Sequence, residues 1–355
     1  MNLAEIRKDI DHLDHEILRL LSERLELGLR ARKFKDTIYD PDREEQIRRR
    51  LSRISRAYPL IQPEFLERLF ATILEGSRKI QEAERTLIGF QGEHGAFGEE
   101  AARYYDPGLA AIPCPDFVDV FEGVERESLD LGIVPVENSL GGAITEVNEL
   151  LIKSDLKVIG ALRLRISHCL LGYPESDYRE IRTVYSHPQA LAQCRNFIDR
   201  HRLEAKPFYD TAGAAKMMAE NKPRLAAAIA SRLCAELFDL ELIKENIQDH
   251  EDNFTRFLIL AKKGHERDAE KCSIVFSTPH RAGTLFSVLK IFAEEKINLT
   301  RIESLPCRED PGNSVFFLDF LGANLGPKME QILEKVKAET ATFKCLGCYK
   351  EEVFG

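Results

Sequence analysis

The sequence predicts a multi-domain chain with three successive folds: an all-α unit over residues 1–85, a two-lobed α/β unit over residues 86–262 and an α+β unit over residues 271–355. Apolar residues recur at helical spacing in the first segment. Short apolar runs, each followed by a turn and a helical stretch, fill the second segment. The third segment has the order strand, helix, strand, strand, helix, strand, which is typical of a sandwich with a four-stranded antiparallel sheet.

Composition excludes several classes of function. The chain has 355 residues, 44% of them hydrophobic, and a formal net charge of -9. A mildly acidic surface does not suit nonspecific binding to nucleic acid, because the phosphate backbone requires a basic face. No apolar run is long enough to span a bilayer, and the acidic start of the chain, with Asp9, Asp11 and Asp14, is no secretory signal. We therefore expect a cytoplasmic protein without membrane or nucleic-acid partners.

The cysteines and glycines predict neither a metal site nor a nucleotide cofactor. Eight cysteines are scattered along the chain. The close pair Cys345 and Cys348 lacks a second pair or histidines at zinc spacing, so buried or strand-end thiols are expected. The glycines that follow Gly92 do not have the spacing of a dinucleotide fingerprint. We predict no cofactor.

The first segment is predicted to form three helices. Apolar residues recur at helical spacing from Ile6 to Leu25 with no glycine or proline between them, which predicts a helix from about residue 3 to about residue 36. Asp40 and Pro41 start a second helix, and Pro63 starts a third. Three helices with a first member this long cannot bury their apolar stripes alone. A partner chain, in a homodimer or homotetramer, is therefore expected.

Polar residues of the same segment are spaced like a cationic pocket. Arg24 and Lys35 are eleven residues apart, which would place their Cα atoms on one helical face about 16 Å apart. Ser77 and Gln81 are four residues apart on one face of the third helix. Arg7 lies about 25 Å from Arg24 along the rod and could reach this pocket only from a second, antiparallel copy. Any single arginine here is better explained by a solvated helix face.

The full set of polar residues resembles the active site of the all-helical chorismate mutases. That resemblance implies catalytic roles for Arg7, Arg24, Lys35, Arg43, Glu44 and Gln81, and substrate binding by Asp40 and Ser77. Chorismate rearranges to prephenate in a pericyclic step, so the protein must fold a dianion and stabilise charge on its ether oxygen. Arginines suit the two carboxylates, and lysine and glutamine suit the ether oxygen.

In the second segment, the strand from Phe254 to Leu260 is predicted to complete the first lobe. The chain should cross to the second lobe after about Ile166 and return before Asn253. Because side chains alternate along a strand, Thr255 would face the cleft between the lobes while Arg256 pairs elsewhere. Helix N-termini gathered at one edge of such a sheet suit a carboxylate ligand.

The motifs of this segment resemble those of prephenate dehydratases. The matching stretches are Glu137-Asn138-Ser139, Gly142, His168 to Leu171, Ser186 to Ala190, Ala214-Ala215 and Asn253 to Phe257. The resemblance implies that Thr255 assists loss of the ring hydroxyl as a catalytic residue. It implies substrate binding by Glu137, Asn138, Ser139, Gly142, Ser186, His187, Gln189, Thr211, Asn253, Phe254 and Arg256. Ala96, Gly98 and Ala212 make the segment also similar to plant arogenate dehydratases, so prephenate and arogenate both remain possible substrates.

The last segment follows a polar linker and resembles the ferredoxin-like ACT domains, which bind phenylalanine between paired copies. The residues at the two ACT motifs are Gly283, Thr284, Leu285, Glu303, Ser304, Leu305 and Pro306. Thr284 and Leu305 stand where that family usually has alanine and arginine. A dimerising module without a ligand is the alternative.

Taken together, the three segments resemble the bifunctional chorismate mutase/prephenate dehydratases. The resemblance implies an enzyme of phenylalanine biosynthesis with substrates chorismate and prephenate, and with phenylalanine as effector. A rival hypothesis is a non-catalytic amino-acid sensor, since two-lobed α/β folds like those of periplasmic binding proteins also serve that purpose. A second rival is that the helical unit only dimerises the chain.

Overall fold

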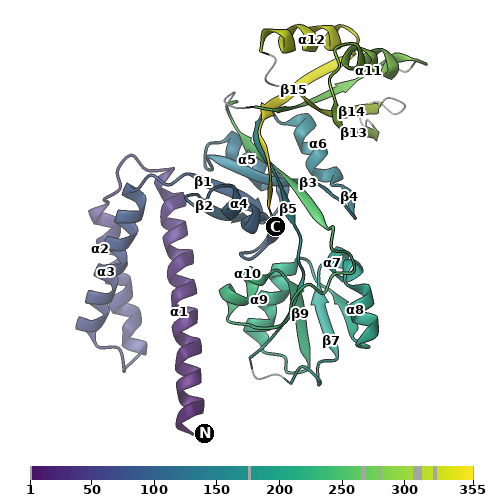
Figure 1. The fold of residues 1–355 in the computed structure, drawn as a ribbon. Helices are drawn as coiled ribbons and strands as arrows, with labels where there is room; N and C mark the ends of the chain where they lie inside the picture. Colours follow the sequence, from purple (N-terminus) through teal and green to yellow (C-terminus); the bar gives the residue numbers. More distant parts are fainter. Residues whose placement is uncertain are drawn as a thin grey trace. The chain divides into compact units, whose positions relative to one another are not determined.

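The computed structural model describes residues 2–174, 177–264, 269–279, 281–306, 314–322 and 326–354. The chain divides into two compact units (Figure 1). One comprises Met1–Leu87 with Gly108–Ala110, and the other comprises Ile88–Pro107 with Ala111–Gly355. Within the described part of the chain, no helix has both the length and the apolar character needed to cross a membrane.

The first unit is helical where the apolar spacing predicts it. Its elements are α1 Leu3–Arg32, α2 Pro41–Ile54, the short 3-10 turn η1 Ser55–Ala57, and α3 Pro63–Glu82. Asn2 and Glu5 form a capping box at the start of α1. The Asp40 side chain accepts a hydrogen bond from the amide of Arg43 at the start of α2. These caps satisfy amides that no helical turn can reach, so the boundaries follow from local chemistry.

The first helix ends at Arg32 and not near residue 36 as predicted. Beyond it, the amides of Lys33, Phe34 and Lys35 bond to carbonyls three residues back, which winds the chain into a tighter turn. The predicted placement of Arg24 and Lys35 on one straight helical face is therefore wrong, because Lys35 belongs to this turn.

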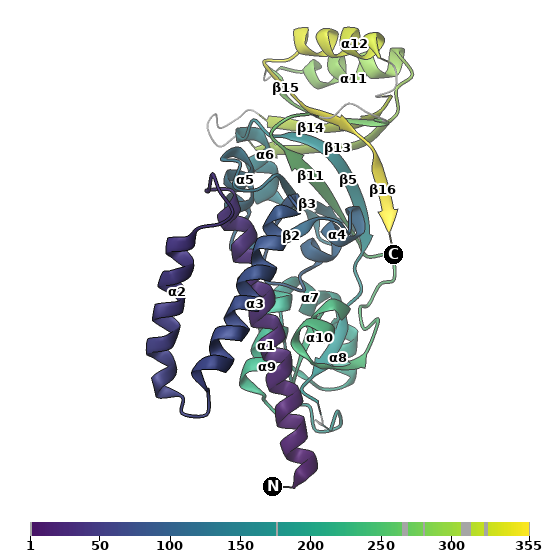
Figure 2. The same cartoon turned by 90° about the vertical axis from the view of Figure 1, so that its left-hand side faces the viewer.

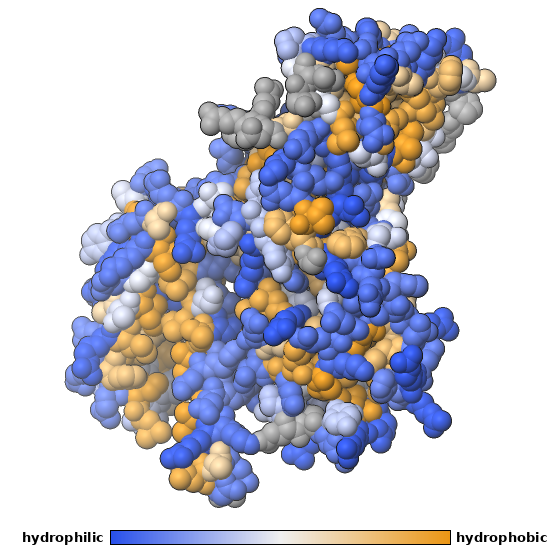
Figure 3. Space-filling view, in the orientation of Figure 1, coloured by the Kyte–Doolittle hydropathy of each residue, from blue (hydrophilic) through white to orange (hydrophobic). Residues whose placement is uncertain are grey.

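Helix α1 approaches α3 closely at a glycine. A Cβ atom on Gly28 would lie 2.8 Å from Ser77 Oγ, so a larger residue would push the helices apart. No residue of α1 is buried, and Leu13, Ile17 and Leu27 are each more than half exposed. Figure 3 shows apolar side chains at the surface of this unit. A single chain therefore leaves the apolar stripe of its first helix uncovered, as the length of the helix predicts.

The first lobe of the second unit is built on a mixed sheet with strand order β16-β5-β11-β3-β1-β2, and β4 pairs with β3. Its strands are β1 Leu87–Gln91, β2 Ala110–Cys114, β3 Leu131–Asn138, β4 Gly142–Ala143, β5 Lys157–Arg165, β11 Phe254–Ala261 and β16 Glu351–Phe354. Its helices are α4 Phe97–Tyr105, α5 Phe117–Glu125 and α6 Thr145–Lys153. Strand β11 pairs antiparallel with both β3 and β5. Ile133 and Ile259 face each other across β3 and β11 and are fully buried, so this pairing lies in the core.

The second lobe has the strand order β10-β6-β9-β7-β8. Its strands are β6 Cys169–Gly172, β7 Thr183–Ser186, β8 Glu204–Pro207, β9 Ala226–Ala230 and β10 Glu241–Lys244, and its helices are α7 Pro188–Gln193, α8 Arg195–Arg200, α9 Thr211–Asn221 and α10 Arg232–Phe238. Every residue of β9 is buried, and four of the five are alanine, which lets neighbouring elements approach its backbone closely. The chain leaves the first lobe after β5 and returns at β11, which confirms the predicted crossing.

The C-terminal part forms a separate sheet with the predicted βαββαβ order. Its elements are β12 Lys271–Ser277, α11 Thr284–Glu294, β13 Leu299–Pro306, β14 Ser314–Leu321, α12 Pro327–Ala338 and β15 Thr342–Tyr349. The strand order is β13-β14-β12-β15, and every pair is antiparallel. Both helices cover one face of this sheet (Figure 2), where Ile274, Phe276, Phe292, Phe320 and Ile332 form the core.

After β15 the chain returns to the first lobe as β16, parallel to β5. The sequence pattern did not predict this strand. The two sheets also meet at Gly347, where a Cβ atom would lie 2.2 Å from the carbonyl oxygen of Val158. Lys344 Nζ donates hydrogen bonds to the carbonyls of Leu151 and Ile152 at the C-terminal end of α6, at 2.8 and 3.1 Å. The C-terminal sheet therefore contacts the first lobe through the backbone at Gly347 and the side chain of Lys344.

Two of the cysteines form a disulfide, Cys272–Cys348, which the sequence did not predict. These residues pair directly across the antiparallel strands β12 and β15, with their Cα atoms 4.1 Å apart. The expectation of separate thiols was wrong for this pair, because 76 residues separate the two in sequence and only the strand register brings them together. Cys169, Cys194 and Cys234 are buried thiols.

Glu100 on helix α4 has a carboxyl group whose burial disfavours its ionised form. Burial raises the pKa of Glu100 from 4.5 to about 6, and nearby Arg103 only partly offsets this. The folded protein therefore binds a proton at Glu100 at pH values where the unfolded chain has lost it. The stability associated with this group is fully present below pH 4.5 and is lost as the pH rises through about 6.

We therefore expect Glu100→Gln to stabilise the second unit in a pH-dependent way. The gain in the free energy of unfolding should be close to zero near pH 4 and should reach about 2 kcal/mol above pH 7. Denaturant unfolding of both proteins across this range measures it. Glu236→Gln, which removes an exposed carboxyl on α10, is the matched control and should show no such rise. A gain for Glu100→Gln that is the same at all pH values would contradict the assignment.

Candidate active site

A cleft of about 360 Å³ opens where the two lobes of the second unit meet. Strands β1, β3 and β11 and the start of α4 line it from the first lobe, and the starts of α7 and α9 line it from the second. Its polar lining residues are Gln91, Asn138, His168, His187, Gln189, Gln193, Tyr209, Asp210, Thr211 and Thr255. Phe97, Phe117, Ile133 and Phe257 are among its apolar lining residues. The cleft therefore offers an apolar floor with several convergent hydrogen-bonding groups.

The hydroxyl of Thr255 lies at the centre of this polar group. Thr255 and Asn138 are paired across β11 and β3, and Asn138 Nδ2 donates a hydrogen bond to Thr255 Oγ1 at 3.0 Å. Because the oxygen of Thr255 is the acceptor in this contact, its own proton stays available to a ligand. The arrangement presents an O–H donor to the cleft.

Asn138 is held in one orientation by its other contacts. Its Oδ1 accepts hydrogen bonds from the amides of Leu140 and Gly141, at 3.1 and 2.8 Å, and from Gln193 Nε2 at 3.3 Å. The same Nδ2 group reaches Asn253 Oδ1 at 2.8 Å. Backbone amides can only donate, so they establish which side of the Asn138 amide is the oxygen. The donor that faces Thr255 is therefore fixed by the turn after β3.

His168 enters the cleft as a neutral imidazole. It is 2% exposed, and burial lowers its pKa. Its Nε2 lies 2.8 Å from Gln193 Oε1, which also accepts a hydrogen bond from Asn253 Nδ2, so Nε2 carries the proton. Its Nδ1 is buried and, among the described residues, has no hydrogen-bond partner. The ring thus keeps a buried acceptor nitrogen without a partner among the described residues.

Asp210 is the acidic residue among the described residues that line the cleft. Burial raises the pKa of this carboxyl, and it accepts a hydrogen bond from the amide of Gly213 as the N-cap of α9, at 2.8 Å. No lysine or arginine is among the described residues that line the cleft. An anionic ligand would therefore be met by side-chain hydrogen-bond donors and by amides at the start of α4.

The structure brings five of the predicted dehydratase residues to the cleft wall: Asn138, His187, Gln189, Thr211 and Thr255. Asn253 lies one step behind, fully buried between Asn138 and Gln193.

The other predicted residues do not line the cleft. Ser186 is fully buried and donates to the carbonyl of Ile229 at 2.5 Å. Ser139 Oγ bridges the chain at Asp252 and Phe254, with both hydrogen bonds at 2.9 Å. The remaining four, Glu137, Gly142, Phe254 and Arg256, are also absent from its lining. Arg256 points to the opposite side of β11, which agrees with the alternation predicted for it.

Sequence reasoning missed Gln193, the residue that joins Asn138, His168 and Asn253. It is four residues beyond Gln189 on α7, so helical spacing places both amides on one face. That spacing was the available signal. Gln91 and Asp210 were missed because each stands alone at the end of a strand or the start of a helix.

In the helical unit, the predicted residues are spread over all three helices and one turn. Arg7 and Arg24 belong to α1, Lys35 to the turn after it, Asp40, Arg43 and Glu44 to the start of α2, and Ser77 and Gln81 to α3. Arg24 is one turn before Gly28, and burial lowers its pKa. Gln81 Nε2 donates to the carbonyl and the hydroxyl of Ser77 at 3.0 and 3.2 Å. Gln81 Oε1 is buried and has no hydrogen-bond partner within the part of the chain that the structure describes. A buried acceptor left unpaired is costly, so this face is suited to a further donor.

At the start of α2, Glu44 is buried and both its oxygens are engaged. Its Oε1 lies 2.5 Å from Arg78 Nη1, and its Oε2 lies 3.4 Å from Arg48 Nη2. Asp40 is used as the helix cap, and Arg43, like Arg7 on α1, is exposed. Arg78, which sequence reasoning did not single out, orients Glu44. The single chain therefore brings Ser77 and Gln81 together against Gly28, one turn after Arg24, and leaves Arg7 exposed.

A further cavity of about 440 Å³ lies in the C-terminal sheet beside the start of α11. Gly283, Thr284 and Leu285 line it, together with Arg281 and Phe316. Glu303, Ser304, Leu305 and Pro306 lie on β13, the edge strand of this sheet. Glu303, Ser304 and Leu305 do not line the cavity.

Two protein-family models match the chain. The model described as chorismate mutase type II matches residues 6–82, and the model described as prephenate dehydratase matches residues 88–265. The first match falls on the helical unit and the second on the two-lobed part, where the cleft is.

Relatives match beyond either model. The chain is 33% identical over 357 residues to the bifunctional chorismate mutase/prephenate dehydratase of Aquifex aeolicus (strain VF5), covering 98% of this chain and 97% of that protein. It is 39% identical over 287 residues to arogenate dehydratase/prephenate dehydratase 2, chloroplastic, of Arabidopsis thaliana, covering 77% and 75%. Among solved structures, prephenate dehydratase in complex with L-Phe from Arthrobacter aurescens aligns with a TM-score of 0.69 and 29% identity, covering 75% of this chain and 90% of that one.

Proposed function

This chain belongs to the family of bifunctional chorismate mutase/prephenate dehydratases, and from that premise we propose which residues perform each reaction and how phenylalanine regulates the second. The chain converts chorismate to prephenate, and prephenate to phenylpyruvate. The observation that carries the dehydratase assignment is the contact from Asn138 Nδ2 to Thr255 Oγ1, because it leaves the hydroxyl proton of Thr255 free at the cleft wall.

In the dehydratase reaction, the C–O bond of the ring hydroxyl breaks while the ring carboxylate leaves as carbon dioxide. The electrons of the broken C–C bond enter the ring, which becomes aromatic, and the departing hydroxide takes up a proton to leave as water. Thr255 donates a hydrogen bond to that oxygen as negative charge develops on it. His187, Gln189 and Thr211 bind the substrate through hydrogen bonds.

We take prephenate as the substrate because the first unit produces it. Arogenate, which has an amino group in place of the keto group, is the alternative. Two features support it: the similarity to the Arabidopsis protein, and the Asp210 carboxylate in the cleft, which suits an ammonium group. Comparing kcat/KM for the two compounds with the wild-type enzyme decides between them.

The mutase site is proposed to be shared between two chains of a homodimer or homotetramer. Arg24, Lys35, Asp40, Arg43, Glu44, Ser77 and Gln81 come from one chain and Arg7 from the other. The uncovered apolar face of α1 and the unpaired Gln81 Oε1 both support a second copy at this face. The arginines orient the two carboxylates of chorismate, and Lys35 and Gln81 stabilise its ether oxygen.

The C-terminal sheet is proposed to be an ACT domain that binds phenylalanine between two copies. Its βαββαβ topology, the cavity at Gly283 to Leu285 and the edge position of β13 support this assignment. The edge strand, with Glu303 to Pro306, is free to meet its counterpart in a second chain. The Arthrobacter relative whose structure contains L-Phe supports the identity of the effector.

Thr255→Ala should lower the dehydratase kcat by roughly 10²- to 10⁴-fold, because it removes the donor to the departing hydroxyl. Thr255→Ser keeps that donor and should retain much more activity. The KM should change less than kcat, since the contact strengthens as the bond breaks. The mutase rate of the same preparation is the internal control and should stay unchanged. Near wild-type dehydration by Thr255→Ala would mean that the threonine is only structural.

Mixing Arg7→Ala chains with Lys35→Ala chains should restore mutase activity that each variant lacks alone. A mixed dimer has one pocket with both wild-type residues and one pocket with neither. Chorismate consumption after joint refolding measures the recovery, and mixing two preparations of Lys35→Ala is the control. A mixed species as inactive as its parents would rule out the shared pocket.

Phenylalanine should bind to the C-terminal sheet and lower the dehydratase rate without changing the mutase rate. Isothermal titration calorimetry and steady-state assays on one preparation test both parts, with D-phenylalanine as the control ligand. The absence of heat and of any rate change at millimolar phenylalanine would remove the regulatory assignment and leave both reactions standing.

A further inference from the structure

Strands β11 and β3 carry Thr255 and Asn138 on the face toward the cleft and an ionic cluster on the opposite face. Thr255 pairs with Asn138 across β11 and β3, and their neighbours Arg256 and Glu137 form the next pair. Side chains alternate along a strand, so the first pair faces the cleft and the second faces the opposite side. The pairing then shifts register between Arg256 and Phe257. Such a bulge aims side chains differently from regular pairing, and it lies beside the reacting groups.

Arg256 uses all three of its nitrogen atoms on the opposite side of β11. Its Nη1 lies 2.5 Å from Asp319 Oδ2, its Nε lies 2.5 Å from Glu351 Oε1, and its Nη2 donates to the hydroxyl of Tyr349 at 2.8 Å. Arg256 is 4% exposed, Asp319 2% and Tyr349 1%. The partners belong to β14, β15 and β16. One side chain therefore connects the strand that carries Thr255 to three strands that follow it in the chain.

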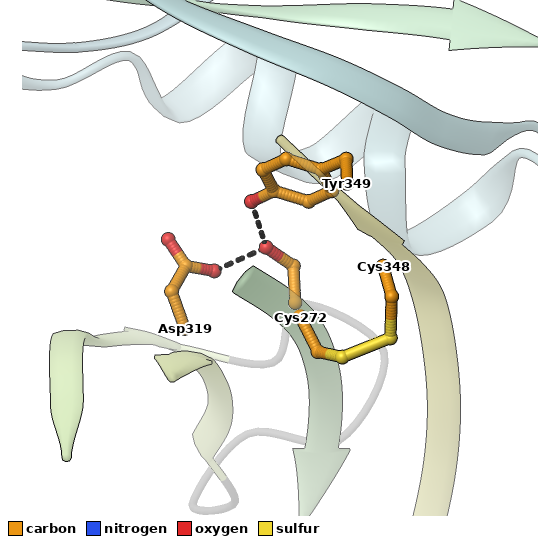
Figure 4. Close-up of a disulfide and its surroundings, with 5 residues drawn as sticks. Cys272, Asp319, Cys348 and Tyr349 are labelled. Atoms are coloured by element: carbon orange, nitrogen blue, oxygen red, sulfur yellow. Dashed lines mark hydrogen bonds between the residues drawn. A yellow bond between two sulfur atoms is a disulfide. The ribbon is translucent and has the colours of Figure 1, made fainter. Parts of the chain in front are cut away.

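A closed ring of hydrogen bonds joins Arg256, Tyr349, Ser273 and Asp319. Arg256 donates to Tyr349, the Tyr349 hydroxyl contacts Ser273 Oγ, and Ser273 Oγ donates to Asp319 Oδ1, whose other oxygen pairs with Arg256. The Cys272–Cys348 disulfide joins the residues next to Ser273 and Tyr349, and Figure 4 shows it beside Asp319 and Tyr349. Strands β12 and β15 are thus covalently joined where the ring passes between them.

Charges in this cluster balance. Arg256, Lys271 and Arg301 face Glu137, Asp319 and Glu351, which gives three cations and three anions. Lys271 Nζ lies 2.5 Å from Glu351 Oε2. Arg301 Nε lies 3.3 Å from Glu137 Oε2, close enough for an ion pair although its N–H is not directed at that oxygen. Burial opposes the charge of Arg256, but its neighbours Asp319 and Glu351 outweigh burial and keep its pKa above the ordinary value.

We propose that Arg256 is a positioning residue for dehydration: held in the ring by Asp319, Ser273 and Tyr349, it fixes β11 against β3 so that Thr255 and Asn138 meet in the cleft. The C-terminal sheet is then part of the dehydratase itself, in addition to any effector that it binds. This inference rests on the proposed role of Thr255. Because Arg256 and Thr255 are consecutive in β11, a shift of the backbone at Arg256 also displaces Thr255.

The test removes members of the ring that carry no charge and do not line the cleft. Ser273→Ala and Tyr349→Phe each delete one hydroxyl of the ring. Ser277→Ala is the matched control, because Ser277 and Thr342 make the same kind of hydroxyl contact, at 2.7 Å, between the same strands β12 and β15. Dehydratase kcat and KM, the mutase rate and the unfolding temperature are measured for each full-length variant.

We expect Ser273→Ala and Tyr349→Phe to lower the dehydratase kcat by roughly ten- to a hundredfold, as small misplacements of a reacting group do. The KM should stay within about twofold, since the cleft residues of the second lobe are untouched. Ser277→Ala and the mutase rates should stay at wild-type values. Variants that unfold at a lower temperature with an unchanged kcat would overturn the proposal, because the ring would then serve stability alone.

Thr255→Ala separates this inference from the role of Thr255. If the ring acts through Thr255, Tyr349→Phe should lower kcat in the wild-type background and have little further effect in the Thr255→Ala background. Losses that multiply would show that the ring acts on another group and would overturn the proposal. A strong loss for Thr255→Ala with none for Tyr349→Phe would overturn the positioning role and leave the catalytic role of Thr255 intact.

Discussion

The antiparallel pairing of β11 with both β3 and β5 is the constraint on which the second unit depends. The chain passes through the whole second lobe before it supplies this central strand, so the lobe is closed from both ends. The same pairing sets Thr255 beside Asn138 on one side and Arg256 beside Glu137 on the other. A slip by one residue would exchange the two sides. A guanidinium would then enter the cleft, and a hydroxyl would face the carboxylates of Glu137, Asp319 and Glu351.

The two units differ in what they bury and in what they leave exposed. The second unit buries Arg256 and Asp319 as an ion pair, so both side chains are held in place. The first unit leaves apolar side chains uncovered and a buried carbonyl unpaired. The uncovered face of α1 is where the proposed second copy would pack.

The pattern of apolar residues was sufficient to predict the helices and strands that produce a regular pattern. The apolar spacing predicted the helices of the first unit, and the order of elements predicted the antiparallel sheet at the C-terminal end. Strand β16 was missed because four residues at an edge, Glu351 to Phe354, carry no recognisable alternation. The disulfide and the position of Gln193 depend on register and on helix packing between distant segments. A single sequence does not encode those contacts in any local pattern.

Only some residues of each predicted motif reach the cleft, and strand geometry explains why. Glu137 and Asn138 are adjacent in one motif, and Thr255 and Arg256 are adjacent in another, yet only Asn138 and Thr255 reach the cleft. A contiguous motif on a strand necessarily includes residues of both faces. The alternation along β11 had already indicated this for Thr255 and Arg256. For Ser186, which points into the core of the second lobe, the motif alone gave no such indication.

The return of the chain as β16 limits how the C-terminal sheet can move. Strand β12 follows β11, and β15 continues into β16, which pairs with β5, the neighbour of β11. A module on a single tether can swing in any direction. A sheet that is connected to two adjacent strands is restricted to rotation about the line that joins the two connections. Any rearrangement in that sheet would therefore reach the cleft as a small tilt about one axis, and the direction of that tilt is set by the topology of the chain.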